Sequence, residues 1–263
     1  MMEFIQESPL KEPLIFDSHA HYEDSRFDQD RENLFETLKA HGVGGIITCG
    51  CDKESSLAAL KMAKESDIVY AAVGIHPGNI DSGTTVSDIE KLLNFEKCVA
   101  IGEIGLDYYW VQDNKEKQKE IFISQLELAK KYNLPVLVHD RDAHADTLEI
   151  LKEYKPKGVV HSFSGSMEMA EDIINLGMYI GVGGVITFKN AKKLPDIVKN
   201  LPEDKILLET DAPYLSPVPF RGKTNNSALI YLTAEKIAEI RNTTTEHILK
   251  ITYQNAKTLF GIN

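Results

Sequence analysis

The sequence has few of the residues that mark secreted or membrane-spanning proteins. It contains three cysteines, Cys49, Cys51 and Cys98, among 263 residues, which is too few for a disulfide framework and favours free thiols. Cys49-Gly50-Cys51 is by itself a weak metal-binding motif, because no second pair of cysteines accompanies it. No apolar run approaches the ~20 residues that cross a bilayer. Residues 1–13 are mixed and acidic rather than a charged-then-apolar export signal. We therefore expect a cytoplasmic protein with no membrane contact.

Positive charge is also scarce. The chain has 29 Lys and Arg against 40 Asp and Glu, a formal net charge of −11. Non-specific nucleic-acid binding depends on Lys and Arg contacts to phosphates, so a broad basic surface is not expected. A substrate with phosphates is not excluded, since a bound divalent metal supplies local positive charge.

No Pro/Gly/Ser-rich linker, internal repeat or low-complexity segment divides the chain. Short apolar runs instead alternate with amphipathic segments. The runs lie at 14–16, 44–49, 68–75, 98–104, 135–138, 159–160, 178–182 and 206–208; helical patterns lie near 28–40, 53–65, 86–95, 115–132, 143–154, 167–176, 190–200, 228–241 and 244–259. Eight apolar strands alternating with helices are typical of a (β/α)8 TIM barrel. We predict one TIM-barrel domain over residues 1–263, with 1–13 as a short surface arm.

Polar residues follow or end five of these runs. Active-site residues of such barrels come from the C-terminal ends of the strands. Side chains alternate along a strand, so His19 and His21 should point to the same face and can bind one ion. The pair alone is weak evidence, because two solvent-facing histidines in a turn would have the same spacing. The other strand-end residues are Glu103, His139, His161 and Asp211.

Four histidines and two carboxylates at strand ends form a set suited to a divalent metal. Imidazole and carboxylate ligands suit Zn²⁺ and Mn²⁺ and, less comfortably for the imidazoles, Mg²⁺. Six ligands exceed what one open catalytic zinc normally takes, so two ions sharing a carboxylate is the economical arrangement.

Six sequence blocks resemble those of TatD-family metal-dependent hydrolases, in the family's order. They are Asp17-Ser18-His19-Ala20-His21, Gly74-Ile75-His76-Pro77, Gly102-Glu103-Ile104-Gly105-Leu106-Asp107, His139-Asp140-Arg141-Asp142-Ala143, His161-Ser162-Phe163-Ser164-Gly165 and Glu209-Thr210-Asp211-Ala212-Pro213-Tyr214. The resemblance implies a TIM barrel of the amidohydrolase type and a deoxyribonuclease, a 3′–5′ exonuclease acting on DNA ends.

The resemblance also implies a role for each residue of the set. His19, His21 and Asp211 would hold one metal, and His139 and His161 the other, with Glu103 bridging them. Asp211 would also be the general base for a metal-activated water that hydrolyses the phosphodiester.

Further residues are predicted to contact substrate or to support the ligands. The substrate candidates are His76, Arg141, Tyr109 and Arg221, and the supporting candidates are Asp17 and Glu209. Alternatives stay open for three of them. His76 would equally satisfy a loop carbonyl, and Arg141 would equally form a salt bridge to a nearby aspartate. The aromatic residues around Tyr109 would equally cap the barrel mouth.

One loop departs from the family pattern. After Arg221-Gly222-Lys223 the family usually continues into Asn-Glu-Pro, but this chain has Thr224-Asn225-Asn226-Ser227. The barrel and metals do not choose between phosphorus and carbonyl centres. The alternative functions are therefore a metal-dependent esterase or amidohydrolase, including aminoacyl-tRNA deacylation, and, more remotely, a non-catalytic binding protein. No obligate protein partner is evident.

Overall fold

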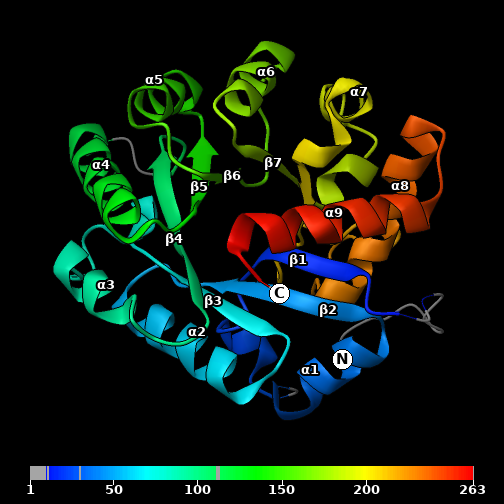
Figure 1. Ribbon diagram of the computed structural model, residues 1–263, viewed down its shortest axis with the longest axis horizontal. Coiled ribbons are helices and arrows are strands. Elements are labelled where there is room, and N and C mark those ends of the chain that lie inside the picture. The colour runs from blue at the N-terminus through cyan, green and yellow to red at the C-terminus, as the bar shows by residue number, and fades with distance from the viewer. Residues whose placement is uncertain (1–9, 11, 30, 111–112, 263) are drawn as a thin grey trace.

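The predicted barrel is confirmed. The computed structural model describes residues 10, 12–29, 31–110 and 113–262, so most of the predicted arm at 1–13 lies outside the described residues. Eight described strands form one parallel sheet in sequence order (Figure 1). They are β1 (Ile15–Ala20), β2 (Val43–Cys49), β3 (Val69–Val73), β4 (Cys98–Asp107), β5 (Val136–Arg141), β6 (Gly158–Val160), β7 (Tyr179–Val182) and β8 (Ile206–Leu208).

Helices surround the sheet. The α-helices are α1 (Arg31–Ala40), α2 (Lys53–Glu65), α3 (Val86–Leu92), α4 (Lys115–Tyr132), α5 (His144–Tyr154), α6 (Met167–Asn175), α7 (Leu194–Asn200), α8 (Ile230–Arg241) and α9 (Thr245–Phe260). Short 3₁₀ turns are η1 (Ser25–Phe27), η2 (Pro77–Asn79), η3 (Gly184–Thr187), η4 (Glu203–Lys205) and η5 (Ser227–Leu229). Side-chain hydrogen bonds cap the N-termini of several helices. Asp52, for example, accepts a hydrogen bond from the backbone N–H of Ser55 at the start of α2.

Three strands run further than the apolar pattern predicts. β1 continues to Ala20, β4 to Asp107 and β5 to Arg141, because the residues that follow the apolar runs are mostly polar; those of β1 and β4 are buried. A strand that carries functional groups at its inward positions loses the apolar signal by which it is recognised.

The barrel closes at its predicted functional end. Ala20 and Ala212 form an isolated parallel bridge beyond the end of β8. The backbone N–H of Asp211 donates to the carbonyl of His19 at 2.9 Å, and that of His21 donates to Ala212 at 2.7 Å. These bonds join the last strand to the first and fix the two polar strand ends side by side.

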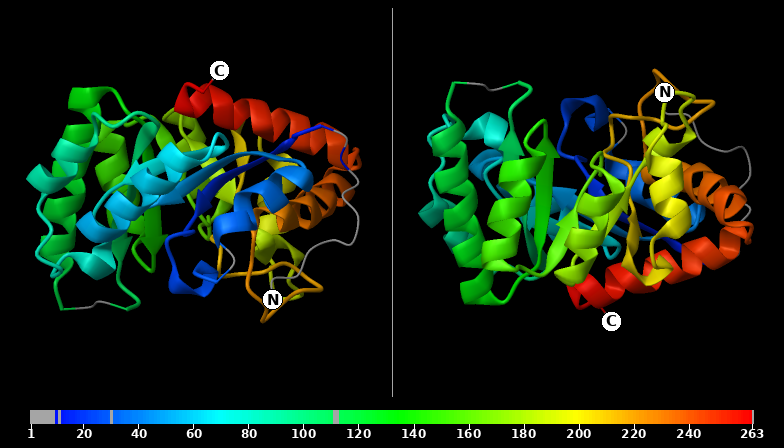
Figure 2. Two further views of the ribbon diagram at one scale, coloured as in Figure 1. Left: turned by 90° about the horizontal axis from the view of Figure 1, so that it is seen from below. Right: turned by 90° about the horizontal axis from the view of Figure 1, so that it is seen from above.

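Helix α9 covers the opposite end. Figure 1 shows it lying across the barrel in front of β1, and in both side views of Figure 2 it lies along one edge while the loop after β8 projects at the other. Ala256 and Phe260 of α9 pack with Phe16 and the apolar side chains inside the barrel. Because α9 seals this end, access to the barrel interior is from the C-terminal ends of the strands.

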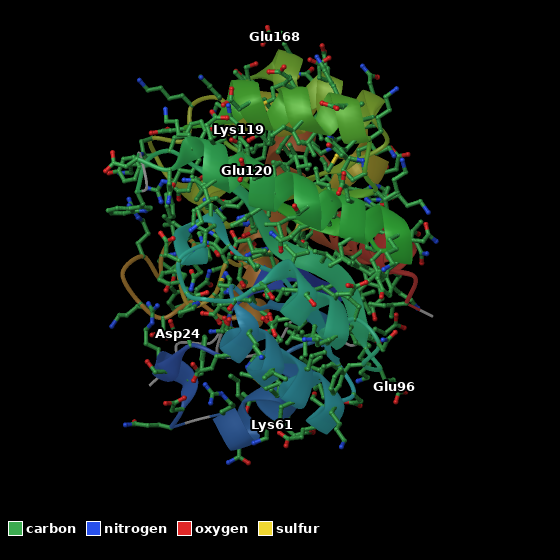
Figure 3. The ribbon with its side chains drawn as sticks, turned by 90° about the vertical axis from the view of Figure 1, so that its left-hand side faces the viewer. Asp24, Lys61, Glu96, Lys119, Glu120 and Glu168 are labelled. Atoms are coloured by element: carbon green, nitrogen blue, oxygen red, sulfur yellow. The ribbon has the colours of Figure 1, made fainter. Side chains whose placement is uncertain are left out.

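The two ends can be followed in the side view of Figure 3. Asp24, just beyond β1, lies toward one end, and Glu96, just before β4, toward the other. Lys119 of α4 forms an ion pair with Asp146 of α5 at 2.7 Å, which joins neighbouring helices of the outer layer. None of the described helices is long and apolar enough to cross a membrane.

Candidate metal centre

The structure brings all six predicted ligands together at the open end of the barrel. His19 lies in β1, Glu103 in β4 and His139 in β5, while His21, His161 and Asp211 directly follow or lie just past β1, β6 and β8. Gly105 permits the close approach of β4 and β5. Its φ is +141°, and a Cβ there would collide with the backbone carbonyl of His139.

Glu103 lies between two groups of side chains and directs one oxygen to each. Its Oε2 is 3.5 Å from His19 Nε2 and 3.3 Å from His21 Nε2. Its Oε1 is 2.7 Å from His139 Nδ1 and 2.8 Å from His161 Nε2. Asp211 belongs to the first group, with Oδ1 3.7 Å from His19 Nε2 and 3.6 Å from His21 Nε2. The two carboxylate oxygens therefore face different pairs of histidines.

The donor sets fit divalent cations. The Nε2 atoms of His19 and His21 are 3.1 Å apart, and His139 Nδ1 is 3.2 Å from His161 Nε2. Two nitrogens roughly 3 Å apart match ligands that share an ion through bonds of about 2.0–2.1 Å. Potential ligand atoms of His19, His21 and Asp211 lie within 4.8 Å of one another, as do those of His19, Glu103 and His161.

The electrostatics of the cluster keep its carboxylates ionised. Burial would raise the pKa of Glu103, but His76, His161 and His19 together hold it well below its usual range. The pKa of Asp211 is also lowered against its burial, by His21, His161 and His19. Burial lowers the pKa of His19 to about 4, whereas against the effect of burial acidic neighbours raise the pKa of His21 and of His161. Because metal ligation requires anionic carboxylates and neutral imidazoles, a bound cation would displace the protons of these two rings.

Two carboxylates that the sequence analysis did not single out orient the histidines. Asp107 Oδ2 is 3.0 Å from His139 Nε2, and Glu23 Oε1 is 3.1 Å from His21 Nδ1. Against the effect of burial, Asp107 and Glu103 raise the pKa of His139 to about 9. Such carboxylate–histidine contacts fix the ring orientation of a metal ligand. Their sequence positions gave a partial indication of this role, because Asp107 ends β4 and Glu23 lies two residues past His21.

We expect Glu23→Gln to weaken the binding of one cation by about 10–100-fold, because the amide is a poorer partner for His21 Nδ1 than the carboxylate. Titration calorimetry or competition with a chelating dye measures this effect, with the exposed Glu120→Gln as the matched control. Equal affinities in Glu23→Gln and the unmodified protein would show that Glu23 does not support the ligand.

The two predicted supporting residues are both buried but do different things. Asp17 accepts hydrogen bonds from the Thr210 backbone at 3.0 Å, the Thr210 hydroxyl at 2.6 Å and the Ser227 hydroxyl at 2.6 Å, and so joins β1 to the loop after β8. Glu209 Oε1 accepts from the backbone of Ser162 and lies 3.9 Å from His161 Nδ1. Burial raises the pKa of Glu209 to about 8.

His76 lies against the metal-ligand cluster. Its Nδ1 accepts a hydrogen bond from the backbone of Gly78 at 3.0 Å, so the ring satisfies a loop N–H rather than a carbonyl. Its Nε2 is 3.7 Å from Glu103 Oε1, and its ring meets that of His139 edge-on with centroids 4.6 Å apart. The side chain therefore presents its second nitrogen to the centre.

Arg141 stacks on aromatic rings instead of pairing with a nearby aspartate. Its guanidinium carbon lies 4.2 Å from the ring centroid of Tyr109 and 5.4 Å from that of Trp110. Asp146 is taken by Tyr108 and Lys119, and within the described part of the chain Arg141 forms no ion pair. The fourth predicted substrate-contacting residue, Arg221, is exposed, and its guanidinium carbon lies 4.1 Å from the ring centroid of Phe188.

The loop that departs from the family pattern is firmly anchored. Asn225 is fully buried, and its side-chain N–H groups donate to the carbonyls of Thr210 at 2.9 Å and Tyr214 at 2.7 Å. Ser227, besides its bond to Asp17, lies 2.7 Å from the hydroxyl of Tyr22. The loop is therefore tied directly to the strand ends that carry the ligands.

Removing divalent cations is expected to lower the Tm. Four imidazoles and two carboxylates converge here at low exposure, and a cation that binds only the folded state adds about 2.7 kcal/mol when present at 100 times its Kd. At roughly 2–4 °C per kcal/mol for a chain of this size, Tm should fall by about 5–10 °C per site on chelation. Scanning calorimetry with and without EDTA measures the shift. An unchanged Tm, with restored cations also without effect, would contradict binding at this centre.

Comparison with known proteins gives near full-length matches. Residues 16–261 match the family model described as TatD related DNase. The chain is 44% identical over 255 residues to the metal-dependent hydrolase YabD of Bacillus subtilis, covering 95% of this chain and 100% of YabD. It is 36% identical over 255 residues to YcfH of Escherichia coli, also named a metal-dependent hydrolase, covering 95% and 96%. The crystal structure of YjjV, a TatD homologue from Escherichia coli, superposes with a TM-score of 0.88 at 33% identity, covering 95% and 99%.

Proposed function

The chain belongs to the TatD family of metal-dependent hydrolases, and we propose that it is a deoxyribonuclease that removes nucleotides from the 3′ ends of DNA with two divalent cations, Mg²⁺, Mn²⁺ or Zn²⁺. The observation that carries this proposal is the division of Glu103 between two ligand clusters. A pair of cations lowers the pKa of water and balances charge on the attacking and leaving oxygens of a phosphodiester.

The side chains have separate tasks in this reaction. Glu103 sets the spacing of the two clusters, and His19, His21, His139 and His161 complete them. Asp211 accepts the proton of the attacking water. It is suited to this because its pKa is lowered and because its side chain, 19% exposed, faces the opening.

The rim of the centre supports a substrate with unpaired bases. Five of the seven exposed large apolar side chains of the described residues lie on the loops after β4 and β8: Tyr109, Trp110, Tyr214, Leu215 and Val218. Arg141 stacks on Tyr109, and Arg26 stacks on Tyr214 at 4.3 Å while its guanidinium is paired with Asp24. Guanidinium groups bind phosphates, and aromatic faces stack on bases. A frayed DNA end presents both phosphates and unpaired bases.

The test is release of mononucleotides from 3′-labelled single-stranded DNA by protein loaded with Mg²⁺, Mn²⁺ or Zn²⁺. A His139→Ala/Asp211→Ala double variant is the control for contaminating nucleases. If protein shown to bind metal releases no nucleotide with any of the three cations, the deoxyribonuclease proposal fails. Turnover equal to that of the double variant would leave only a binding function.

The net charge of −11 favours a second candidate, an esterase or amidohydrolase that uses the same centre on a small neutral substrate; it does not favour aminoacyl-tRNA deacylation, because tRNA is also a long polyanion. An acidic surface repels a long polyanion but not a small neutral ester. Rates on DNA ends and on small esters, measured side by side, separate the two. Ester hydrolysis faster by orders of magnitude would reverse the ranking.

The three free cysteines support the cytoplasmic location proposed for either enzyme.

We expect Arg141→Lys to raise KM for single-stranded DNA about tenfold while kcat changes less, since lysine cannot stack or bind a phosphate through two N–H groups.

Trp110 is the chain's single tryptophan and is 70% exposed, so its fluorescence should be quenched by single-stranded DNA and little by blunt duplex. Quenching is measured in the slow His139→Ala variant. Equal quenching by both DNAs would contradict stacking on unpaired bases.

A further inference from the structure

We propose that Cys51 is an additional metal ligand of this centre, a thiolate that joins His21 and Glu103 and shifts the preference of their site toward zinc-like, softer cations. The inference rests on the metal centre of the proposed function and not on its substrate. Cys51 lies two residues past β2. Its Sγ is 4.0 Å from Glu103 Oε2, the oxygen that lies 3.3 Å from His21 Nε2, and 3.9 Å from the other ring nitrogen of His21, Nδ1.

These separations are close to those within one coordination shell. Potential ligand atoms of His21, Cys51 and Glu103 all lie within 4.8 Å of one another. A zinc ion with a bond of about 2.3 Å to sulfur and about 2.0–2.2 Å to oxygen would hold these two atoms roughly 3.5 Å apart. The observed 4.0 Å between Sγ and Glu103 Oε2 is within reach of a small rotation about χ1.

The backbone around Cys51 is fixed, so the thiol is held at the centre. Its N–H donates to the hydroxyl of Ser55 at 2.9 Å, and its carbonyl accepts from the N–H of His76 at 2.9 Å. Both polar contacts of Sγ in the described residues are to proposed metal ligands. The residue is partly exposed, and a cation or solvent can reach it from the open end of the barrel.

The other two cysteines provide internal controls. Cys49 is fully buried, with Sγ 3.5 Å from His19 Nδ1, and among the described residues its sulfur forms no hydrogen bond with Glu103. Cys98 begins β4 at the end covered by α9, and its Sγ contacts the carbonyl of Ala100 at 4.0 Å. Of the three thiols, all within the described residues, Cys51 is the one whose sulfur contacts the bridging carboxylate.

Coordination by sulfur changes which cation binds best. On binding, the S–H bond of Cys51 breaks, its proton leaves to solvent and a sulfur–metal bond forms. Soft thiolate ligands favour zinc over Mg²⁺ and Mn²⁺, which prefer oxygen. A centre of imidazoles and carboxylates alone would lack this bias.

The test is the absorption spectrum of the full chain loaded with Co²⁺. A sulfur-to-cobalt charge-transfer band is expected in the unmodified protein, in Cys49→Ser and in Cys98→Ser, and is expected to be lost in Cys51→Ser. Zinc affinity of Cys51→Ser, by competition titration, should fall about 10–100-fold while Mg²⁺ affinity stays unchanged. The Tm of each metal-free variant verifies that it is folded.

Three results would overturn the assignment. They are stoichiometric cobalt binding without the band, a band that persists in folded Cys51→Ser, and a band lost in folded Cys49→Ser instead. None of these measurements uses DNA. If the band is present but no DNA is hydrolysed, the deoxyribonuclease proposal fails and the thiolate assignment stands.

Discussion

Replacing Glu103 by alanine is expected to remove both cations and to lower turnover by roughly three orders of magnitude or more. Each oxygen of Glu103 faces a different pair of histidines, at 3.3–3.5 Å on one side and 2.7–2.8 Å on the other. A bound cation contributes several kcal/mol of transition-state stabilisation, and about 1.4 kcal/mol corresponds to a factor of ten in rate. Loss of both cations therefore exceeds the effect of removing any one histidine.

The loss of charge reinforces this effect. Glu103 is an anion among five imidazoles, and it raises the pKa of His139 and of His161. With two cations bound, the negative charge of Glu103 would offset their mutual repulsion. Without it, the second cation would bind next to the first with no shared anion between them. Alanine should therefore weaken the binding of both equivalents.

Metal content after gel filtration, measured together with kcat, checks this expectation. The matched control is Glu120→Ala, an exposed glutamate of α4 that Figure 3 shows on the surface, and it should keep both equivalents and full activity. Two equivalents retained in Glu103→Ala would contradict the bridging role. One equivalent retained would assign Glu103 to a single cluster.

The residues of the centre were predictable where type and position coincided. His19, Glu103, His139, His161 and Asp211 lie in or just past apolar runs, where a buried polar side chain needs a hydrogen-bond partner or a metal ion. The C-terminal ends of parallel strands lie at the same end of a barrel. The alternation of apolar runs and helices therefore predicts that these residues lie close together at that end.

Residues whose role depends on ring orientation could not be found in this way. Glu23 and Asp107 act because one ring nitrogen of His21 and of His139 faces away from the centre, and no sequence spacing encodes which nitrogen that is. Arg141 had acidic neighbours in sequence, yet in space it stacks on Tyr109. Long side chains have many partners within reach, and packing decides among them.

The cover formed by α9 was also beyond the sequence pattern. Its amphipathic period predicts a helix over 244–259, and the structure places it at Thr245–Phe260. The period does not say that its apolar face, with Ala256 and Phe260, meets the inside of the barrel rather than its outer layer. That docking leaves one end open to substrate, and it is set by which apolar surface remains uncovered.

Asp211→Asn is expected to separate proton transfer from metal binding, with kcat falling by about 10²–10⁴-fold while part of the metal is retained. Asparagine has the same shape and keeps one carbonyl oxygen for ligation. It also tolerates the left-handed backbone at this position, where φ is 57°. The N–H donation to His19 at 2.9 Å is a backbone bond and survives the change, so the barrel should stay closed.

The pH dependence of the residual rate identifies the missing group. The lowered pKa of Asp211 keeps the carboxylate ionised around neutrality. In the unmodified enzyme this group should therefore not make kcat depend on pH near neutrality. In Asp211→Asn the proton must leave to solution hydroxide, and kcat at saturating metal should rise about tenfold per pH unit.

The control is Asp204→Asn, a change at an exposed aspartate before β8, which should leave kcat, metal content and the pH profile unchanged. A folded, metal-loaded Asp211→Asn with the kcat of the unmodified enzyme would show that another group takes the proton. His76, whose Nε2 is 3.7 Å from Glu103 Oε1 and whose pKa burial lowers to about 4, would be the next to replace.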